Sequence, residues 1–366
     1  MGADPALARL EIDLSAIAAN WRDLGERHPS GPVAGVVKAD AYGLGAARVA
    51  PALFGAGCRH FFTAHLAEAV AIRALVPQGA QGAMVAVLNG VPAGSEDGFV
   101  AHDVLPVLGT PGEVERWAGL ARRLGRRLPA LLHVDTGMNR LGLGAAQFAA
   151  LVNEPGRLDG IDVRYMMTHL VSSEVANDPL NAVQRERFAA ACARLPGVTR
   201  SFANSSGIFL GAGWASDLAR PGAALYGINP TPGAANPMRA VVRLSARVLA
   251  LRDVKAGESV GYNSTWVAAR DSRIATVGVG YADGWLRSHS GHGHAIFDGA
   301  PLPLVGRVSM DLTTFDATGA PSLREGNMIE LIGPARPVDA VAQAAGTNGY
   351  EILTSLGRRY ARVYRA

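Results

Sequence analysis

The sequence predicts an α/β protein with an N-terminal (β/α)8 barrel of the TIM type and a mainly-β C-terminal domain. Two observations lead to this prediction. Residues 1–230 alternate short apolar, strand-like runs with longer helical patterns, and eight such runs occur. After a break rich in proline and glycine at residues 229–233, short strands separated by turns replace that alternation. Eight strands alternating with helices favour a closed parallel barrel, although a doubly wound open sheet would give a similar alternation.

The candidate barrel strands are short runs of apolar and β-branched residues bounded by turn residues. Helical patterns lie between them, for example at Gly112–Leu124 and Leu180–Leu195. The eight candidate strands are Val33–Lys38, His60–Ala64, Ala83–Leu88, Val104–Leu108, Ala130–Asp135, Val163–Thr168, Arg200–Ala203 and Gly222–Tyr226.

The second part of the chain is predicted to be rich in β-structure and to end in a helix from Asn348 to Leu356. We place the domain boundary so that residues 1–232 form the barrel and residues 233–366 the second domain, with the option that residues before about 12 pack on the latter. The candidate strands here are Met238–Asp253, Ile274–Gly280, His294–Phe297, Leu302–Val308 and Met328–Ile332.

Composition excludes several classes of protein. The 366 residues carry a formal net charge of only +4, and the basic residues are dispersed, which argues against a nucleic-acid-binding surface. Cys58 and Cys192 are far apart, which argues against a disulfide framework and fits a reducing compartment. No apolar run is long enough for a transmembrane helix, and the N-terminus lacks a signal-peptide pattern. We therefore expect a cytoplasmic protein.

Lys38 is the strongest candidate for chemistry, because it closes the apolar run of the first candidate strand. An amine at the apolar end of a strand is partly desolvated, which disfavours its charged form and makes it a better nucleophile. Such a lysine can hold an aldehyde cofactor as a Schiff base. The alternative is a lysine whose apolar stem lies along the strand end while its amine extends into water.

Further polar residues follow later candidate strands, at the end of a barrel where active sites gather. The loops after strands seven and eight often bind phosphate. Ser205 and the backbone amides near Gly222 and Ala223 are suitable donors, although an ordinary Ser/Gly turn is the alternative for each loop. The residues at these positions are His169 after the sixth strand, Asn204 and Ser205 after the seventh, and Arg220, Gly222 and Ala223 around the eighth.

Several segments, taken together and in order, resemble the successive motifs of the alanine racemase family. Each motif alone is weak, whereas the ordered set covers nearly the whole chain. The segments are VVKADAYGLG (36–45), DTGMNRLG (135–142), THL (168–170), ANSSG (203–207), RPGAALYG (220–227), VGYNSTW (260–266), GYADG (280–284), GRVSMD (306–311) and LGRRYARVYR (356–365).

The resemblance implies racemisation of L- and D-alanine with pyridoxal 5'-phosphate, for peptidoglycan synthesis or alanine catabolism. Lys38 would carry the cofactor as a Schiff base and act as one catalytic base. Tyr262 would be the opposite base and come from the second subunit of a homodimer. Two bases are needed because the proton leaves Cα from one face and returns on the other. Lysine and tyrosine normally keep their protons above neutral pH, so each pKa must be lowered.

The remaining site residues are likewise implied by the resemblance alone. Arg220 would face the pyridine nitrogen, with His169 beside the ring and Asn204 in the same cofactor-binding set. Arg140 would contact the cofactor and the substrate carboxylate. The phosphate would be held by Tyr42, Ser205, Gly222, Ala223 and Tyr350, while Met310 and Tyr281 of the partner subunit would line the substrate entrance and Asp311 would support the same site.

One position departs from the family pattern. Many alanine racemases have a carbamylated lysine seven residues before the arginine of the DTGM motif, and here that residue is His133. Histidine cannot form that stable carbamate, and a protonated imidazole would repel Arg140. We expect either a neutral His133 that accepts a hydrogen bond or a bound anion such as chloride.

Other interpretations of the sequence remain open. One is a racemase of the same fold that acts on serine, lysine or arginine. Another is a non-catalytic protein that binds pyridoxal phosphate, which the long C-terminal part disfavours. His289, His292 and His294 have a spacing that could hold a metal ion, but we expect an exposed loop and no metal. Trp285 and Trp266 are expected to be packing residues.

Overall fold

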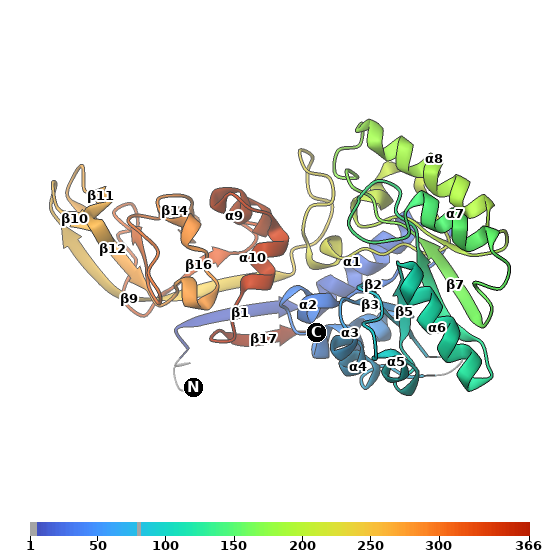
Figure 1. Ribbon diagram of the computed structural model, residues 1–366. Helices are drawn as coiled ribbons and strands as arrows, with labels where there is room; N and C mark the ends of the chain where they lie inside the picture. The colour runs from blue at the N-terminus through green and yellow to red at the C-terminus, as the bar shows by residue number, and fades with distance from the viewer. Residues whose placement is uncertain (1–5, 79–81) are drawn as a thin grey trace.

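The computed structural model describes residues 6–78 and 82–366 and has two lobes (Figure 1). One lobe consists of parallel strands surrounded by helices. The other is an elongated β-rich lobe, and the two are joined by β1, β9 and the segment before β9. Within the described ranges, no helix is long and apolar enough to cross a membrane.

The first lobe is the predicted parallel barrel, and this part of the fold prediction is confirmed. Seven strands pair in parallel in chain order. Bridges from Ser201 to Leu218 and from Val33 to Ala219 place residues 218–219 in the eighth position, between the last and first strands. The seven strands are β2 (Gly35–Val36), β3 (His60–Thr63), β4 (Met84–Val87), β5 (Leu105–Leu108), β6 (Leu128–His133), β7 (Ile161–Met167) and β8 (Arg200–Ser201).

Helices cover the outside of the barrel, and their ends follow from local sequence. In α6, Thr110 caps the first turn, Pro111 is the first residue, and Gly125 ends the helix in a left-handed conformation. The two helices predicted above correspond to α6 and α8. The helices of this lobe are α1 (Leu14–Arg27), α3 (Ala46–Ala56), α4 (Leu66–Arg73), α5 (Glu96–Ala101), α6 (Pro111–Leu124), α7 (Ala145–Asn153) and α8 (Pro179–Ala193).

The predicted strand at Gly222–Tyr226 is wrong. Residues Ala223–Tyr226 form a 3-10 helix, η3, which packs against α1, and Leu225 and Tyr226 are fully buried in it. A short buried apolar run has the same composition in a strand as in a helical turn, so the sequence pattern does not separate the two.

The first predicted strand ends at Val36, two residues earlier than expected, and Lys38 begins a short helical segment, α2 (Lys38–Tyr42). Residues 39–42 all have φ between 52° and 56°, so this turn is left-handed. The left-handed conformation costs about 1–2 kcal/mol for each residue with a Cβ atom, and none of these four is glycine. The surrounding structure must therefore stabilise the turn.

The second lobe is built around the long strand β9 (Val242–Val254), as the predicted β-rich domain requires. β9 pairs with β1 (Ala8–Asp13), which comes from the start of the chain, and β17 (Ala361–Arg365) lies parallel to β1. The other elements are β10 (Ser259–Val260), β11 (Trp266–Val267), β12 (Ser272–Val277), β13 (His294–Phe297), β14 (Ala300–Pro303), β15 (Thr313–Asp316), β16 (Met328–Ile332), α9 (Val338–Ala345) and α10 (Gly349–Ser355).

Two predictions for this lobe need correction. The strand predicted at Leu302–Val308 is β14 at residues 300–303, and beyond it Leu304 makes only an isolated bridge to Phe315. The predicted terminal helix corresponds to α10, whereas β1, β10, β11, β15, β17 and α9 were not predicted.

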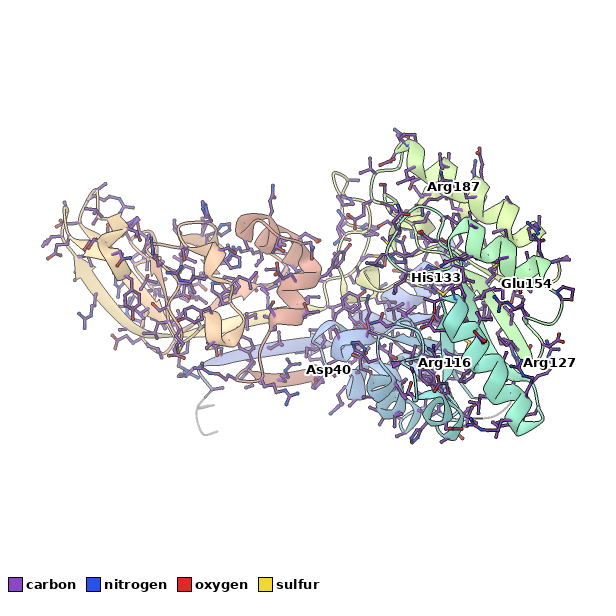
Figure 2. The ribbon with its side chains drawn as sticks, viewed as in Figure 1. Asp40, Arg116, Arg127, His133, Glu154 and Arg187 are labelled. Carbon is purple, nitrogen blue, oxygen red and sulfur yellow. The ribbon has the colours of Figure 1, made fainter. Side chains whose placement is uncertain are left out.

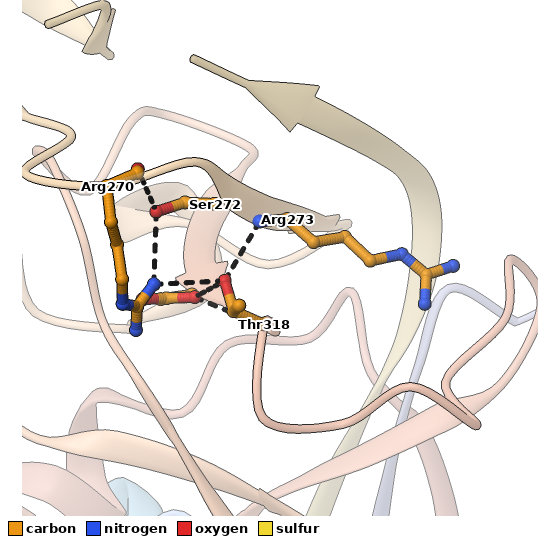
Figure 3. Close-up of polar contacts among 5 residues, drawn as sticks. Arg270, Ser272, Arg273 and Thr318 are labelled. Atoms are coloured by element: carbon orange, nitrogen blue, oxygen red, sulfur yellow. Dashed lines mark hydrogen bonds and ion pairs between the residues drawn. The ribbon is translucent and has the colours of Figure 1, made fainter. Parts of the chain in front are cut away.

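A polar network fastens the start of β12 to the end of β15 (Figure 3). The Arg270 guanidinium donates to Ser272 Oγ (3.2 Å) and pairs with Asp316 (3.1 Å). The backbone N–H of Arg273 donates to Thr318 Oγ1 (2.9 Å). Because Arg270 is exposed, the network is expected to contribute only modestly to stability.

The expected exposure of His289 is wrong: the side chain is 0 % exposed and stacks on buried Trp285, with ring centroids 4.3 Å apart. Burial, and then the nearby Arg336 charge, lowers the pKa of His289 to about 4. In the described ranges, no group of three His, Cys, Asp or Glu side chains could hold a metal ion. His289 is therefore a neutral core residue.

We expect the free energy of unfolding to fall as the pH falls from about 6.5 to about 4. In that window the unfolded chain binds a proton at His289 and the folded chain does not. The contribution of His289 to the free energy of unfolding therefore falls by up to about 1.4 kcal/mol for each pH unit. Urea unfolding of the wild type and of His289→Phe at pH 7.5 and pH 5 measures the effect. An identical pH dependence for the two proteins would contradict it.

Candidate active site

A cavity of about 390 Å³ lies at the mouth of the barrel, between the strand-end loops and α10. All nine residues predicted to bind the cofactor line it, and so does Arg140. The structure thus brings together Lys38, Tyr42, His169, Asn204, Ser205, Arg220, Gly222, Ala223 and Tyr350.

The Lys38 amine is half-buried at this mouth. Burial is the main cause that lowers its pKa, and the positive charge of Arg140 lowers it further, while the Glu68 carboxylate acts in the opposite direction. A larger fraction of the amine is therefore neutral, and nucleophilic, than for a lysine in water.

The last strand of the chain fastens the end of the turn that carries Lys38. Arg362 Nη1 donates to the carbonyl oxygen of Gly43 (2.7 Å), and the Tyr364 hydroxyl donates to that of Leu44 (3.0 Å). These two side chains belong to the motif at residues 356–365, for which no role was predicted. Only the pairing of β17 with β1 brings it beside Lys38, and the sequence carries no direct signal of that pairing.

A small cradle lies where phosphate was expected. Ser205 Oγ accepts hydrogen bonds from the backbone N–H groups of Gly222 (3.0 Å) and Ala224 (3.2 Å), which leaves its own proton for a ligand in the cavity. A Cβ atom on Gly222 would lie 2.2 Å from the Tyr42 hydroxyl, so any larger residue would displace the Tyr42 side chain. A 3-10 helix of five residues, η1 (Ser206–Leu210), follows Ser205.

Tyr350 reaches this cradle from α10 of the other lobe. Its hydroxyl donates to Glu174 Oε1 (2.5 Å), and its ring lies 6.4 Å from that of Tyr42. Glu174 also lines the cavity and was not predicted. Its position follows from the loop between β7 and α8, which the sequence does not specify.

Arg220 supplies a fixed positive charge at the base of the cavity. Its guanidinium donates to the carbonyl oxygen of Thr168 (2.5 Å) and to Ser201 Oγ (2.5 Å). Burial lowers its pKa only to about 10, so it stays charged near neutral pH. Burial, followed by the Arg220 charge, lowers the pKa of neighbouring His169 to about 3, so that imidazole is neutral.

His133 ends β6 inside the barrel (Figure 2). Burial, and then the charge of Arg220, lowers its pKa to about 4, so it is neutral near pH 7. In the following loop, the Asp135 carboxylate accepts hydrogen bonds from the backbone N–H groups of Gly137 (2.9 Å), Met138 (2.9 Å) and Asn139 (3.0 Å). These bonds shape the loop that carries Arg140, which lies exposed at the cavity.

The four residues expected from a partner subunit do not line this cavity. Tyr262, Tyr281 and Met310 are 67 %, 42 % and 55 % exposed on the β-rich lobe. The backbone N–H of Tyr281 donates to Ser309 (3.0 Å), which places it beside Met310. Asp311 pairs with Arg359 (2.7 Å). A single chain therefore holds ten of the predicted site residues at one place and presents the other four elsewhere.

The cavity residues fit pyridoxal phosphate by their chemistry. A partly desolvated amine suits an aldehyde, as Lys38 provides. The Ser205 hydroxyl keeps its proton for a ligand, and the backbone at Gly222 has no Cβ atom to obstruct a close approach, which together suit a phosphate. The buried charge of Arg220 suits the lone pair of a ring nitrogen.

Comparisons with known proteins identify the family of the chain. Two family models match the chain: "Alanine racemase, N-terminal domain" over residues 12–230 and "Alanine racemase, C-terminal domain" over residues 241–364. The chain is 56% identical to an alanine racemase of Acidiphilium cryptum over 357 residues, which cover 98% of each protein. It is 50% identical to that of Rhodospirillum rubrum over 364 residues, which cover 99% of this chain and 96% of the relative.

A solved structure of similar fold contains a cofactor. The structure is that of alanine racemase from Bartonella henselae with covalently bound pyridoxal phosphate. It matches with a TM-score of 0.95 at 41% identity, and the match covers 99% of this chain and 100% of that one. The biosynthetic alanine racemase from Pseudomonas aeruginosa matches with a TM-score of 0.89 at 34% identity, over 99% and 100% of the two chains.

Proposed function

This chain belongs to the alanine racemase family, and from that premise we propose that it interconverts L-alanine and D-alanine with a covalently held pyridoxal 5'-phosphate. The observation that carries the proposal is the convergence of the nine expected cofactor-binding residues on one cavity beside the amine of Lys38. The covalent cofactor of the Bartonella henselae enzyme supports it. The D-alanine would serve peptidoglycan synthesis, or the reaction would serve alanine catabolism, in the cytoplasm.

The residues of the cavity would hold the cofactor in a defined orientation. Lys38 would bind it covalently through Nζ. Arg220 would face the ring nitrogen, and its positive charge would disfavour protonation of that nitrogen. Ser205 and the amide of Ala223 would donate to the phosphate. Tyr350 would exchange its bond to Glu174 for one to a phosphate oxygen. Tyr42, His169 and Asn204 complete this set.

The chemistry divides between the cofactor and the side chains. When bound, pyridoxal phosphate withdraws electrons from the substrate Cα and makes its proton removable. Lys38 exchanges a proton with one face of Cα, and its lowered pKa increases the fraction able to accept that proton. Arg140 binds the substrate carboxylate and so orients the Cα–H bond.

The opposite face of Cα requires a second base, and Tyr262, the residue expected in that role, does not line the cavity of its own chain. We propose that Tyr262 of the partner subunit in a homodimer supplies it, with Tyr281, Met310 and Asp311 of the same partner at the entrance. The exposure of Tyr262 and Met310 in a single chain supports this arrangement. In functional terms, residues 1–232 would supply the cofactor site apart from Tyr350, and residues 233–366 would supply Tyr350 and complete the neighbouring site.

The neutral His133 favours the first of the two alternatives for this position. A neutral imidazole does not repel Arg140, so no bound anion is required to offset a second charge. We therefore expect kcat and KM for alanine to be unchanged when chloride is replaced by gluconate at constant ionic strength. A KM that rises as chloride is removed would support a bound chloride instead.

The two other functional interpretations make different predictions for one experiment. The measurement is the loss of optical activity of L-alanine by the purified, cofactor-loaded protein. Rapid loss is expected for an alanine racemase. Faster racemisation of serine, lysine or arginine than of alanine would indicate a broader racemase. A bound cofactor with no racemisation of any amino acid would indicate a binding protein.

A further inference from the structure

We propose that Glu68 is a positioning residue for Lys38, which holds the left-handed turn after the lysine and places a negative charge against the backbone of the next residue. This inference rests on the proposed function, because it concerns the lysine that would carry the cofactor. Glu68 does not line the cavity and would touch neither cofactor nor substrate. Its effect would reach them through the backbone of residues 38–42.

The Glu68 carboxylate connects two neighbouring strand-end loops. Glu68 is the third residue of α4, and its Oε2 accepts hydrogen bonds from the backbone N–H groups of Ala64 (2.9 Å) and His65 (3.2 Å), just before that helix. Its Oε1 accepts from the N–H of Ala39 (2.6 Å) in the preceding loop. Glu68 Oε1 thus fixes the position of Ala39, the residue that immediately follows Lys38.

The turn at residues 39–42 needs such support. All four residues have positive φ although none is glycine, so this conformation is unfavourable unless the surroundings hold it. Ala39 is the first of them, and its N–H receives a charge-assisted hydrogen bond, which is stronger than one between neutral groups. Since the lysine side chain leaves the backbone one residue earlier, loss of this bond would change the direction in which Nζ points.

The Glu68 charge also acts on the amine directly. Burial and Arg140 both lower the pKa of Lys38, and Glu68 raises it. Removing only this charge should lower the pKa of Lys38 further. A purely structural contact would not have that effect, so the pH dependence of the amine separates the two roles.

The chain contains a matched control, Glu113. It is the third residue of α6, and it accepts hydrogen bonds from Gly109 (2.8 Å) and Thr110 (3.0 Å) before its helix and from Val91 (3.0 Å) in the preceding loop. The hydrogen-bonding pattern is the same as that of Glu68. The loop at Val91, however, carries no residue predicted to bind the cofactor.

The experiment compares Glu68→Gln with Glu113→Gln and the wild type as full-length, cofactor-loaded proteins. The first readout is the rate at which each protein loses pyridoxal phosphate on dilution. For the second, cofactor-stripped protein is mixed with pyridoxal phosphate and reduced with borohydride at a series of pH values. The readout is the pH at which half of the protein carries cofactor fixed on Lys38, and the mass of the modified peptide identifies that lysine. Thermal unfolding of each protein records any general loss of stability.

We expect Glu68→Gln to lose the cofactor about tenfold faster than Glu113→Gln and its trapping midpoint to move to lower pH. Glu68→Asp keeps the charge but is too short for all three bonds, so it should lose cofactor faster while its midpoint stays near that of the wild type. This variant also tests the proposal if Glu68→Gln does not fold.

Two results would overturn the proposal. In the first, the wild type traps cofactor on Lys38, but Glu68→Gln and Glu113→Gln have the same rate of cofactor loss and the same trapping midpoint. This result rejects the positioning role alone. The other is a wild type that traps no cofactor on Lys38, which rejects the proposed function together with this inference.

Discussion

Lys38→Ala is expected to lower the rate of alanine racemisation by roughly 10⁴-fold or more, the largest effect of any single substitution in this chain. Two contributions disappear together: the covalent attachment of the cofactor and one of the two bases. The substitution removes a half-buried amine whose pKa is already lowered by burial, so no large loss of folding stability should accompany it. Racemisation of L-alanine, together with the absorbance of the bound cofactor, measures the effect.

Lys255→Ala is the control for this prediction. The sequence contains only two lysines, Lys38 and Lys255. The Lys255 side chain is 75 % exposed and pairs with Asp271 (2.8 Å) on the β-rich lobe. Borohydride should therefore fix the cofactor on a single lysine peptide. Wild-type activity in Lys38→Ala, or cofactor fixed on Lys255, would reject the assignment of Lys38.

Tyr262→Phe is expected to lower racemisation by about 10²–10⁴-fold, because it removes one proton donor and acceptor and nothing else. The side chain is 67 % exposed in the single chain, so its hydroxyl supports no packing there. With Lys38 intact, Cα–proton exchange with solvent should persist for one enantiomer and fail for the other. Measuring kcat in both directions, with deuterium uptake in D2O, gives these quantities.

Tyr165→Phe is a suitable comparison for this prediction. Its hydroxyl lies 3.1 Å from His60 Nε2, and it does not line the cavity. It loses a phenol hydroxyl, as Tyr262→Phe does, but outside the proposed site. Equal activities of the two variants would show that no special role belongs to Tyr262.

The sequence predicted the gathering of the cavity residues because one topological rule suffices for it. In a parallel barrel the C-terminal ends of all strands meet at one mouth, so His169 and Ser205 had to lie together once their strands were recognised. Arg220 joins them because residues 218–219, and not the predicted 222–226, take the eighth position. The roles of individual residues came from the family resemblance.

The parts that the sequence did not predict depend on contacts between distant segments or on unusual backbone geometry. The left-handed turn after Lys38 contains no glycine, so no residue type signals it. Nothing in the sequence distinguishes Glu68 from an ordinary surface glutamate, because only the packing of neighbouring loops brings its carboxylate to the N–H of Ala39. His289 lies in a Ser/Gly-rich stretch that reads as exposed, but its stacking on Trp285 buries it.

The central claim is that each active site combines Lys38 of one chain with Tyr262 of another. Co-expression of Lys38→Ala and Tyr262→Phe chains with different tags, followed by isolation of the mixed dimer, tests it most directly. In such a dimer one site would have both native residues and the other neither, so we expect about half of the wild-type activity per dimer, although each parent is nearly inactive. A mixed dimer as inactive as its parents would contradict the claim, because it would mean that both residues must belong to the same chain.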